Sequence, residues 1–143
     1  MILTNLTVSE EGQKHLIGDL KTKGLILDNL FSMFCYFLKN PMFDFISNIV
    51  ANVTAMKEGR EVVIEYAMMP KILDILRYDK VNAHRRKHLI EALRNVAFEY
   101  EGMEGKFLES GLVKEVAHVL SNEIGLLENI PEEIGQFKAF KAL

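Results

Sequence analysis

Two histidines, His84 and His88, stand four residues apart, a spacing that can place two imidazoles on one helix face and let them bind zinc. A zinc site needs further ligands, and the sequence contains neither an HExxH pattern nor a pair of cysteines. It also contains no Gly-rich phosphate loop, no GxSxG elbow and no convincing pair of catalytic carboxylates. We therefore predict no metal site, no cofactor and no catalytic residue, and we expect the protein not to be an enzyme.

Three asparagines, Asn5, Asn52 and Asn95, share a local pattern with an apolar residue two positions before the amide and another one position after it. A carboxamide offers both a donor and an acceptor, which is enough to hold the backbone of an extended peptide. On this interpretation the asparagines form a ladder along a binding surface. The alternative is that each amide only satisfies neighbouring backbone groups of its own chain.

One helical turn before the second and third asparagines lie Asn48 and Glu91, which we expect on the same helix face as the amides. The Glu91 carboxylate would favour a basic group in a partner. Arg94 is the basic residue next to the third asparagine. The candidate partner-binding site is therefore polar and consists of Asn48, Asn52, Glu91, Arg94 and Asn95. We expect it on the concave face of the helical solenoid that is predicted below.

Charge and composition narrow the class of protein. The net charge of -3 gives no overall attraction to nucleic acid or to an anionic membrane, and the one dense basic run, 84–88, is expected to be a solvated helix start. Cys35 is the single cysteine and is expected in the core. The first residues lack the features of a signal peptide, and no apolar stretch is long enough to span a bilayer. We expect a soluble, cytoplasmic protein that binds neither nucleic acid nor membrane.

The asparagines also reveal an internal repeat. They are 47 and then 43 residues apart, within the range of roughly 40–47 residues that is typical of HEAT and armadillo repeats. Each is followed seven positions later by a glycine, and these glycines are Gly12, Gly59 and Gly102. We expect each glycine to precede a short first helix.

The central repeat has the clearest punctuation. We predict a short, a medium and a long helix over 58–67, 71–78 and 83–98, with Pro70 opening the second helix and Asn82 capping the third. Short, medium and long helices in this order are typical of an armadillo repeat and not of a two-helix HEAT unit. The sequence therefore predicts three-helix repeats.

The flanking segments repeat the same order. Upstream we predict helices over 13–20, 25–38 and 42–56, and downstream a second helix that follows Gly111. Armadillo-like repeats are thus predicted over 1–121, as 1–11 (tail of a third helix), 12–57 (repeat), 58–101 (repeat) and 102–121 (partial repeat), before an acidic loop and C-terminal tail at 122–143. Neither end resembles a polar cap. We expect an all-α, armadillo-type right-handed superhelical solenoid of three-helix repeats, truncated at both ends, whose uncapped ends can self-associate.

The segment 89–99, with the sequence LIEALRNVAFE, resembles the LRN-x-x-FE core of the HGH-one family of armadillo-like proteins. The resemblance extends over roughly residues 45–137. It implies a cytosolic chaperone adaptor that recognises translation elongation factor two during folding and cooperates with the cytosolic chaperonin. The repeat alone leaves an alternative open, a generic armadillo scaffold that binds an extended peptide in trafficking or signalling.

Overall fold

The computed structural model describes residues 2–19, 22–77, 81–99 and 101–123. All regular structure in these ranges is helical, which confirms the predicted all-α class. The helices are α1 (Ile2–Leu6), α2 (Glu10–Ile17), α3 (Leu25–Tyr36), η1 (Pro41–Phe43), α4 (Phe45–Val53), α5 (Lys57–Glu65), α6 (Met68–Arg77), α7 (Ala83–Val96), η2 (Ala97–Glu99), α8 (Glu104–Glu109) and α9 (Leu112–Glu123). Within these ranges no helix is long and apolar enough to cross a membrane.

The chain forms two compact units, Met1–Leu112 and Val113–Leu143. In the second unit only the α9 residues up to Glu123 are described. The predicted acidic loop was expected to begin at residue 122, and α9 includes its first two residues. The rest of that predicted loop and the tail lie outside the described residues.

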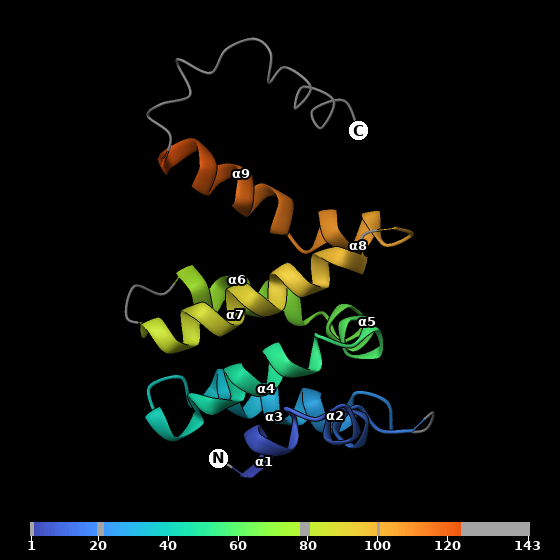
Figure 1. Ribbon diagram of the computed structural model, residues 1–143. Coiled ribbons are helices and arrows are strands. Elements are labelled where there is room, and N and C mark those ends of the chain that lie inside the picture. The colour runs from blue at the N-terminus through green and yellow to red at the C-terminus, as the bar shows by residue number, and fades with distance from the viewer. Residues whose placement is uncertain (1, 20–21, 78–80, 100, 124–143) are drawn as a thin grey trace. The chain divides into compact units, whose positions relative to one another are not determined.

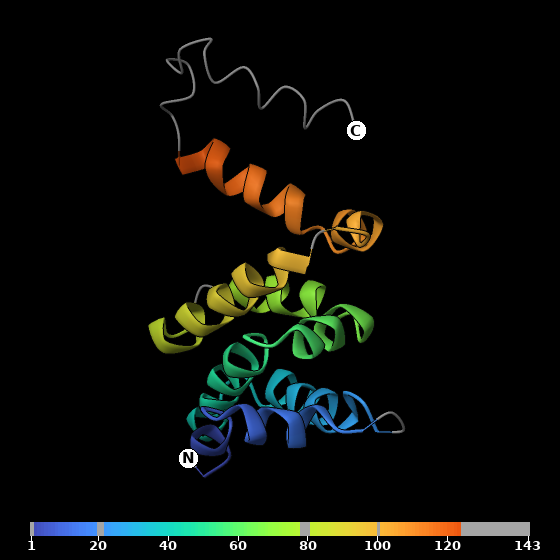
Figure 2. The same ribbon diagram turned by 45° about the vertical axis from the view of Figure 1, so that its right-hand side comes forward.

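Two groups of three helices make up most of the first unit. The helices α2, α3 and α4 form one group, and α5, α6 and α7 form the next, in the predicted order of first, second and third helix. Each helix packs on its counterpart, α2 on α5, α3 on α6 and α4 on α7, and α1 packs on α4. Figure 1 shows the α5–α7 group lying above the α2–α4 group, and Figure 2 shows the same layers after a 45° turn.

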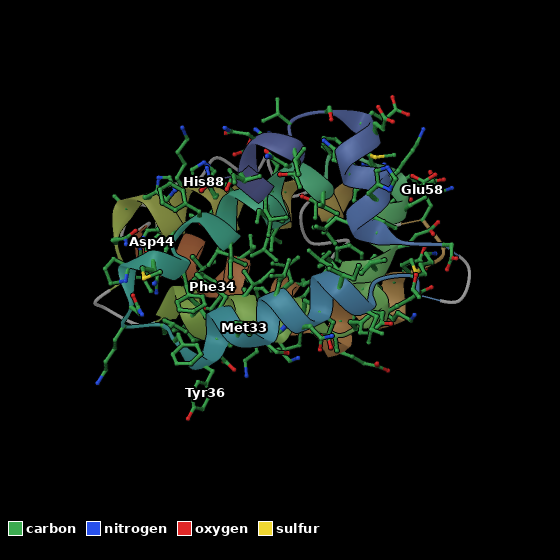
Figure 3. The ribbon with its side chains drawn as sticks, turned by 90° about the horizontal axis from the view of Figure 1, so that it is seen from below. Met33, Phe34, Tyr36, Asp44, Glu58 and His88 are labelled. Atoms are coloured by element: carbon green, nitrogen blue, oxygen red, sulfur yellow. The ribbon has the colours of Figure 1, made fainter. Side chains whose placement is uncertain are left out.

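Apolar side chains between the helices hold the two groups together. Leu27, Phe31 and Phe34 of α3 are fully buried, as are Met68 and Ile72 of α6. Fully burying one such side chain contributes about 1.5–3 kcal/mol. In Figure 3 Phe34 points into the unit, while Tyr36, two residues on, points away from it and is 82% exposed. The same view places His88 of α7 on the side opposite Tyr36, so the third and second helices form opposite faces.

The helix starts differ from the prediction in an informative way. We expected α2 to begin after Gly12, but it begins at Glu10, because the Ser9 hydroxyl accepts a hydrogen bond from the Gly12 amide over 3.2 Å and caps the helix. Likewise α6 begins at Met68 and not at Pro70, after a turn in which Ala67 has a φ of 49°. A proline in the first turn of a helix costs no hydrogen bond, since those amides have no intrahelical acceptor.

Gly12 and Gly59 therefore lie inside their helices, and close packing requires them. A Cβ on Gly12 would come within 1.9 Å of the Leu6 carbonyl oxygen, and one on Gly59 within 2.1 Å of the Val53 carbonyl oxygen. Gly102 is different, because it lies outside α8 with a φ of 78° and nothing near its Cβ position. The first two glycines are structurally equivalent, and the third, matched by sequence, is not.

Arg85 corrects the prediction that the basic run is a solvated helix start. Arg85 is 3% exposed, and its guanidinium carbon lies 5.0 Å from the centre of the Phe34 ring. The guanidinium donates to the Asp44 carboxylate over 2.5 Å, to the Leu38 carbonyl, and to the Asn40 carbonyl over 2.9 Å. A planar donor group with five N–H bonds can serve all these acceptors at once. Arg85 thus ties α7 to the connection between α3 and α4.

Candidate functional site

Two of the three asparagines in the predicted ladder, Asn52 and Asn95, donate hydrogen bonds within the chain. Asn52 Nδ2 donates to Thr7 Oγ1 over 3.1 Å and lies 3.5 Å from the Thr4 carbonyl oxygen. Asn95 Nδ2 donates to Thr54 Oγ1 over 3.3 Å and to the Ala51 carbonyl oxygen over 3.4 Å. Each amide therefore binds the C-terminal end of the preceding third helix.

The threonines make the same arrangement at both steps. Thr7 Oγ1 donates to the Thr4 carbonyl over 2.9 Å, and Thr54 Oγ1 donates to the Ala51 carbonyl over 2.8 Å. Both threonines are fully buried. Because each hydroxyl proton is used within its own helix, the oxygen is left to accept from asparagine. The NH₂ groups of both amides therefore satisfy neighbouring groups of the same chain, as in the alternative interpretation.

The acceptor atoms of the two amides are not used in this way. Within the described residues, Oδ1 of Asn52 and Oδ1 of Asn95 have no hydrogen-bond donor from the protein, and both side chains are partly exposed. An exposed carbonyl oxygen of this kind can accept from a backbone N–H of another chain. The two asparagines therefore leave hydrogen-bond acceptors, and not donors, available to another chain.

Sequence reasoning missed a second repeated contact, made by the residue directly after each packed glycine. Gln13 Nε2 donates to the Thr7 carbonyl over 2.8 Å, and Arg60 Nη1 donates to the Thr54 carbonyl over 3.3 Å and the Ala55 carbonyl over 2.9 Å. Arg60 also forms an ion pair with Glu99 at 2.6 Å. The signal was present in the sequence, since a long polar donor follows Gly12 and Gly59.

Asn48 is held between the two histidines of α7. His88 Nδ1 lies 2.8 Å from the His84 carbonyl oxygen and must donate to it, so the neutral ring accepts from Asn48 Nδ2 at its Nε2 over 3.1 Å. Asn48 Oδ1 in turn accepts from His84 Nε2 over 2.5 Å. The carboxamide uses both of its polar atoms here, and Phe45 packs edge-on against His84. Asn48 is a packing residue between α4 and α7.

Glu91 and Arg94 are the two charged residues of the predicted site, and neither forms an ion pair with the described residues. Glu91 is partly exposed and lies one helical turn before Asn95. Arg94 is exposed, but it does not lie on the helix face that carries Glu91 and Asn95. By the repeat it corresponds to Ala51, which is buried where α4 packs on α7. Arg94 therefore lies on the side of α7 that faces away from α4, which we call its outer side. It does not belong to the surface that Glu91 and Asn95 form.

The second-helix face carries a hollow of about 550 Å³ between α3 and α6, lined by Cys35, Leu38, Lys39, Lys71, Asp74 and Ile75. Cys35, predicted to be core, is partly buried against the core and lines this hollow. Burial raises the pKa of its thiol, so the thiolate is disfavoured at neutral pH. In the described ranges no three His, Cys, Asp or Glu side chains are grouped to hold a metal ion.

Taken together, the described residues form an all-helical protein with two stacked three-helix groups and a polar third-helix face. A family model described as a domain of unknown function, DUF383, matches residues 1–125, and the chain belongs to this family. No curated protein and no solved structure matches the chain.

Proposed function

We propose that the chain is a protein-binding scaffold, part of an armadillo-type right-handed superhelical solenoid. The observation that supports this fold is the repeated junction. The same asparagine–threonine bond joins α4 to the end of α1 and α7 to the end of α4, and the same glycine contact recurs beside it. Repeats that contact only their neighbours through one conserved geometry stack into an extended surface.

The binding surface in this proposal is the third-helix face, and it works by binding and not by catalysis. The exposed Oδ1 atoms of Asn52 and Asn95 accept from the partner's backbone, and Glu91 pairs with a basic side chain. The NH₂ groups stay within the chain and hold the acceptors in fixed positions. Fixed acceptors reduce the conformational entropy that is lost on binding.

The partner we propose is translation elongation factor two, with the chain acting in the cytoplasm as an adaptor to the cytosolic chaperonin. The support is the resemblance of residues 89–99 to the LRN-x-x-FE core of the HGH-one family. These residues lie in α7 and η2, the segment that carries both Glu91 and Asn95. The resemblance thus falls on the proposed binding face.

The test is binding of purified elongation factor two and purified chaperonin to the immobilised chain. We expect both to be retained, and we expect Glu91→Lys to reduce retention of elongation factor two at least tenfold. Glu109→Lys is the matched control, because it makes the same charge change at an exposed position at the end of α8. If neither protein is retained by the unsubstituted chain, the adaptor function is wrong.

A generic peptide-binding scaffold is the second candidate, and the two uncovered amide oxygens favour it. Backbone acceptors recognise an extended chain whatever its side chains are. Under this alternative, unrelated extended peptides would compete with elongation factor two for the third-helix face. Under the adaptor function they would not compete at comparable concentrations.

A further inference from the structure

The outer side of α7 differs from the outer side of α4, on which α7 packs. Ser47 and Ala51 of α4 are 0% and 4% exposed, and the Ala51 carbonyl accepts a hydrogen bond from Asn95 of α7 over 3.4 Å. Small residues at these two positions let the two helices approach closely. Counting 43 residues on, as between Asn52 and Asn95, the corresponding positions in α7 are Ile90 and Arg94. A bulky apolar residue and a long cation have replaced two small ones.

These residues are open to solvent. Ile90 is 51% exposed and Arg94 is exposed, as is Lys87, one turn before Ile90. Within the described part of the chain, neither Lys87 nor Arg94 forms an ion pair. We call the surface made by Lys87, Ile90 and Arg94 the outer α7 face.

Charge and spacing define what fits there. Lys87 and Arg94 are seven residues apart, about 10 Å along the helix axis, with Ile90 between them. Glu91 is the one acidic residue of α7, and it lies toward the Asn95 side. The other two arginines of α7 are engaged elsewhere, Arg85 with Asp44 and Arg86 with the Leu76 carbonyl over 3.2 Å. The outer α7 face thus consists of two cations, unpaired among the residues that the structure describes, on either side of one apolar side chain.

We propose that the outer α7 face binds an acidic amphipathic helix of a partner protein, with two carboxylates one heptad apart on either side of an apolar side chain. Two helices packed side by side present matching positions at i, i+3 or i+4, and i+7. The carboxylates pair with Lys87 and Arg94, and the apolar side chain covers Ile90. This inference rests on the proposed protein-binding function and adds a second contact surface with a defined charge.

Two synthetic helical peptides of equal length test the proposal. One carries Glu at its first and eighth helical positions and Leu at the fourth, and the other carries Lys in place of both Glu residues. We expect the acidic peptide to bind the full chain in a fluorescence anisotropy titration, and binding to weaken with added salt. We expect the basic peptide to bind at least tenfold more weakly. Equal binding of the two peptides, or no binding of the acidic peptide at about 1 mM, overturns the proposal.

Charge reversal localises the contact. In the double variant Lys87→Glu with Arg94→Glu, we expect the acidic peptide to lose at least tenfold in affinity and the basic peptide to gain. Ile90→Ser should weaken both. All three positions are exposed, so circular dichroism and the urea midpoint should show an intact fold. Unchanged binding of the acidic peptide to the charge-reversed chain overturns the proposal.

Sedimentation of the chain alone separates a partner protein from a second copy. If the chain self-associates and the charge-reversed variant does not, then the outer α7 face binds another copy and the proposed partner helix is wrong. The peptide result is also independent of the adaptor test. Elongation factor two retained without acidic-peptide binding refutes only this inference, whereas acidic-peptide binding without retention refutes only the adaptor function.

Discussion

Thr54 accepts a hydrogen bond from Asn95 over 3.3 Å, although 41 residues separate the two. Thr54 lies at the end of α4, the helix that also carries Asn52, and Asn52 makes the equivalent bond to Thr7. The two bonds fix the register of three successive third-helix segments. At the end of α7 the equivalent residue is Ala97, which has no hydroxyl to accept from a further asparagine. The described series of asparagine–threonine bonds therefore ends at Asn95.

The first prediction concerns this bond. We expect Asn95→Ala and Thr54→Val each to lower the free energy of unfolding by about 1–2 kcal/mol, because each removes one hydrogen-bond partner from a buried or half-buried polar group. The double variant should lose less than the sum, with a coupling of about 1 kcal/mol. Urea denaturation of the four proteins measures this. Asn5→Ala is the control, since Asn5 is exposed, and should cost less than about 0.5 kcal/mol. Additive losses would show that the two side chains do not interact.

The second prediction contrasts two helical glycines. In Gly59→Ala the new Cβ would collide with the Val53 carbonyl oxygen, 2.1 Å away, and α5 would have to move away from the end of α4. We expect a loss of about 2 kcal/mol or more. Gly105→Ala in α8 meets nothing within 4 Å and should be neutral or stabilising by up to about 1 kcal/mol, the difference in helix propensity. Thermal unfolding of the two variants compares them directly. A similar melting temperature for both would contradict the close approach at Gly59.

The sequence predicted the order of the helices well because the repeat supplies independent copies of the same signal. The apolar-x-Asn-apolar pattern located α4 and α7, and the expected cap Asn82 does accept from the Arg85 amide over 2.8 Å. Boundaries shifted where local capping decided them, as at Ser9. Gly102 is not structurally equivalent to the two earlier glycines of the repeat, because η2 and a turn separate α7 from α8. A sequence match at fixed spacing does not reveal this difference.

The candidate site was harder to predict, since each of its side chains chooses among partners that only tertiary structure brings together. Asn48 was assigned to a binding surface, yet the histidines of α7, 36 and 40 residues away, take up its amide. The buried position of Arg85 could not be read from a run of basic residues. Its acceptors include two carbonyls of the connection between α3 and α4, which carry no side-chain signal.

The third prediction concerns Arg85. In Arg85→Met the methionine fills part of the space but leaves the Asp44 carboxylate and two carbonyls without their donor, so we expect a loss of about 3–5 kcal/mol. Arg85→Lys keeps the charge but cannot reach all the acceptors at once. Its free energy of unfolding should lie between that of the unsubstituted chain and that of Arg85→Met. Lys87→Met is the control, since Lys87 is exposed in the same helix. If Arg85→Met is too unstable to give a measurable unfolding transition, the near-ultraviolet circular dichroism still reports whether the contact with Phe34 forms. Equal urea midpoints for the variants at 85 and 87 would contradict the buried network.

The last prediction concerns pH and the ion pair between Lys23 and Glu61, whose charged atoms are 2.8 Å apart. The hydrogen bond with Lys23 lowers the pKa of Glu61, and the bond with Glu61 raises the pKa of Lys23. A lowered carboxyl pKa stabilises the fold above the ordinary pKa of glutamate, and this is lost as the pH falls through the folded value. A raised lysine pKa stabilises below the ordinary lysine pKa and is lost at higher pH. The pair should therefore contribute over a plateau between about pH 5 and pH 10.

A double-mutant cycle with Lys23→Met and Glu61→Gln measures that contribution. Because both side chains are partly exposed, we expect a coupling of only about 0.5–1 kcal/mol at pH 7, decreasing with salt. As the pH falls through the lowered pKa of Glu61, the carboxylate becomes protonated and the coupling should approach zero. Lys14 and Glu10 form a shorter but more exposed pair in α2, with their charged atoms 2.5 Å apart, and serve as the comparison, with a smaller coupling expected. A coupling between Lys23 and Glu61 that does not fall as the solution is acidified would mean that the two side chains interact through packing and not through charge.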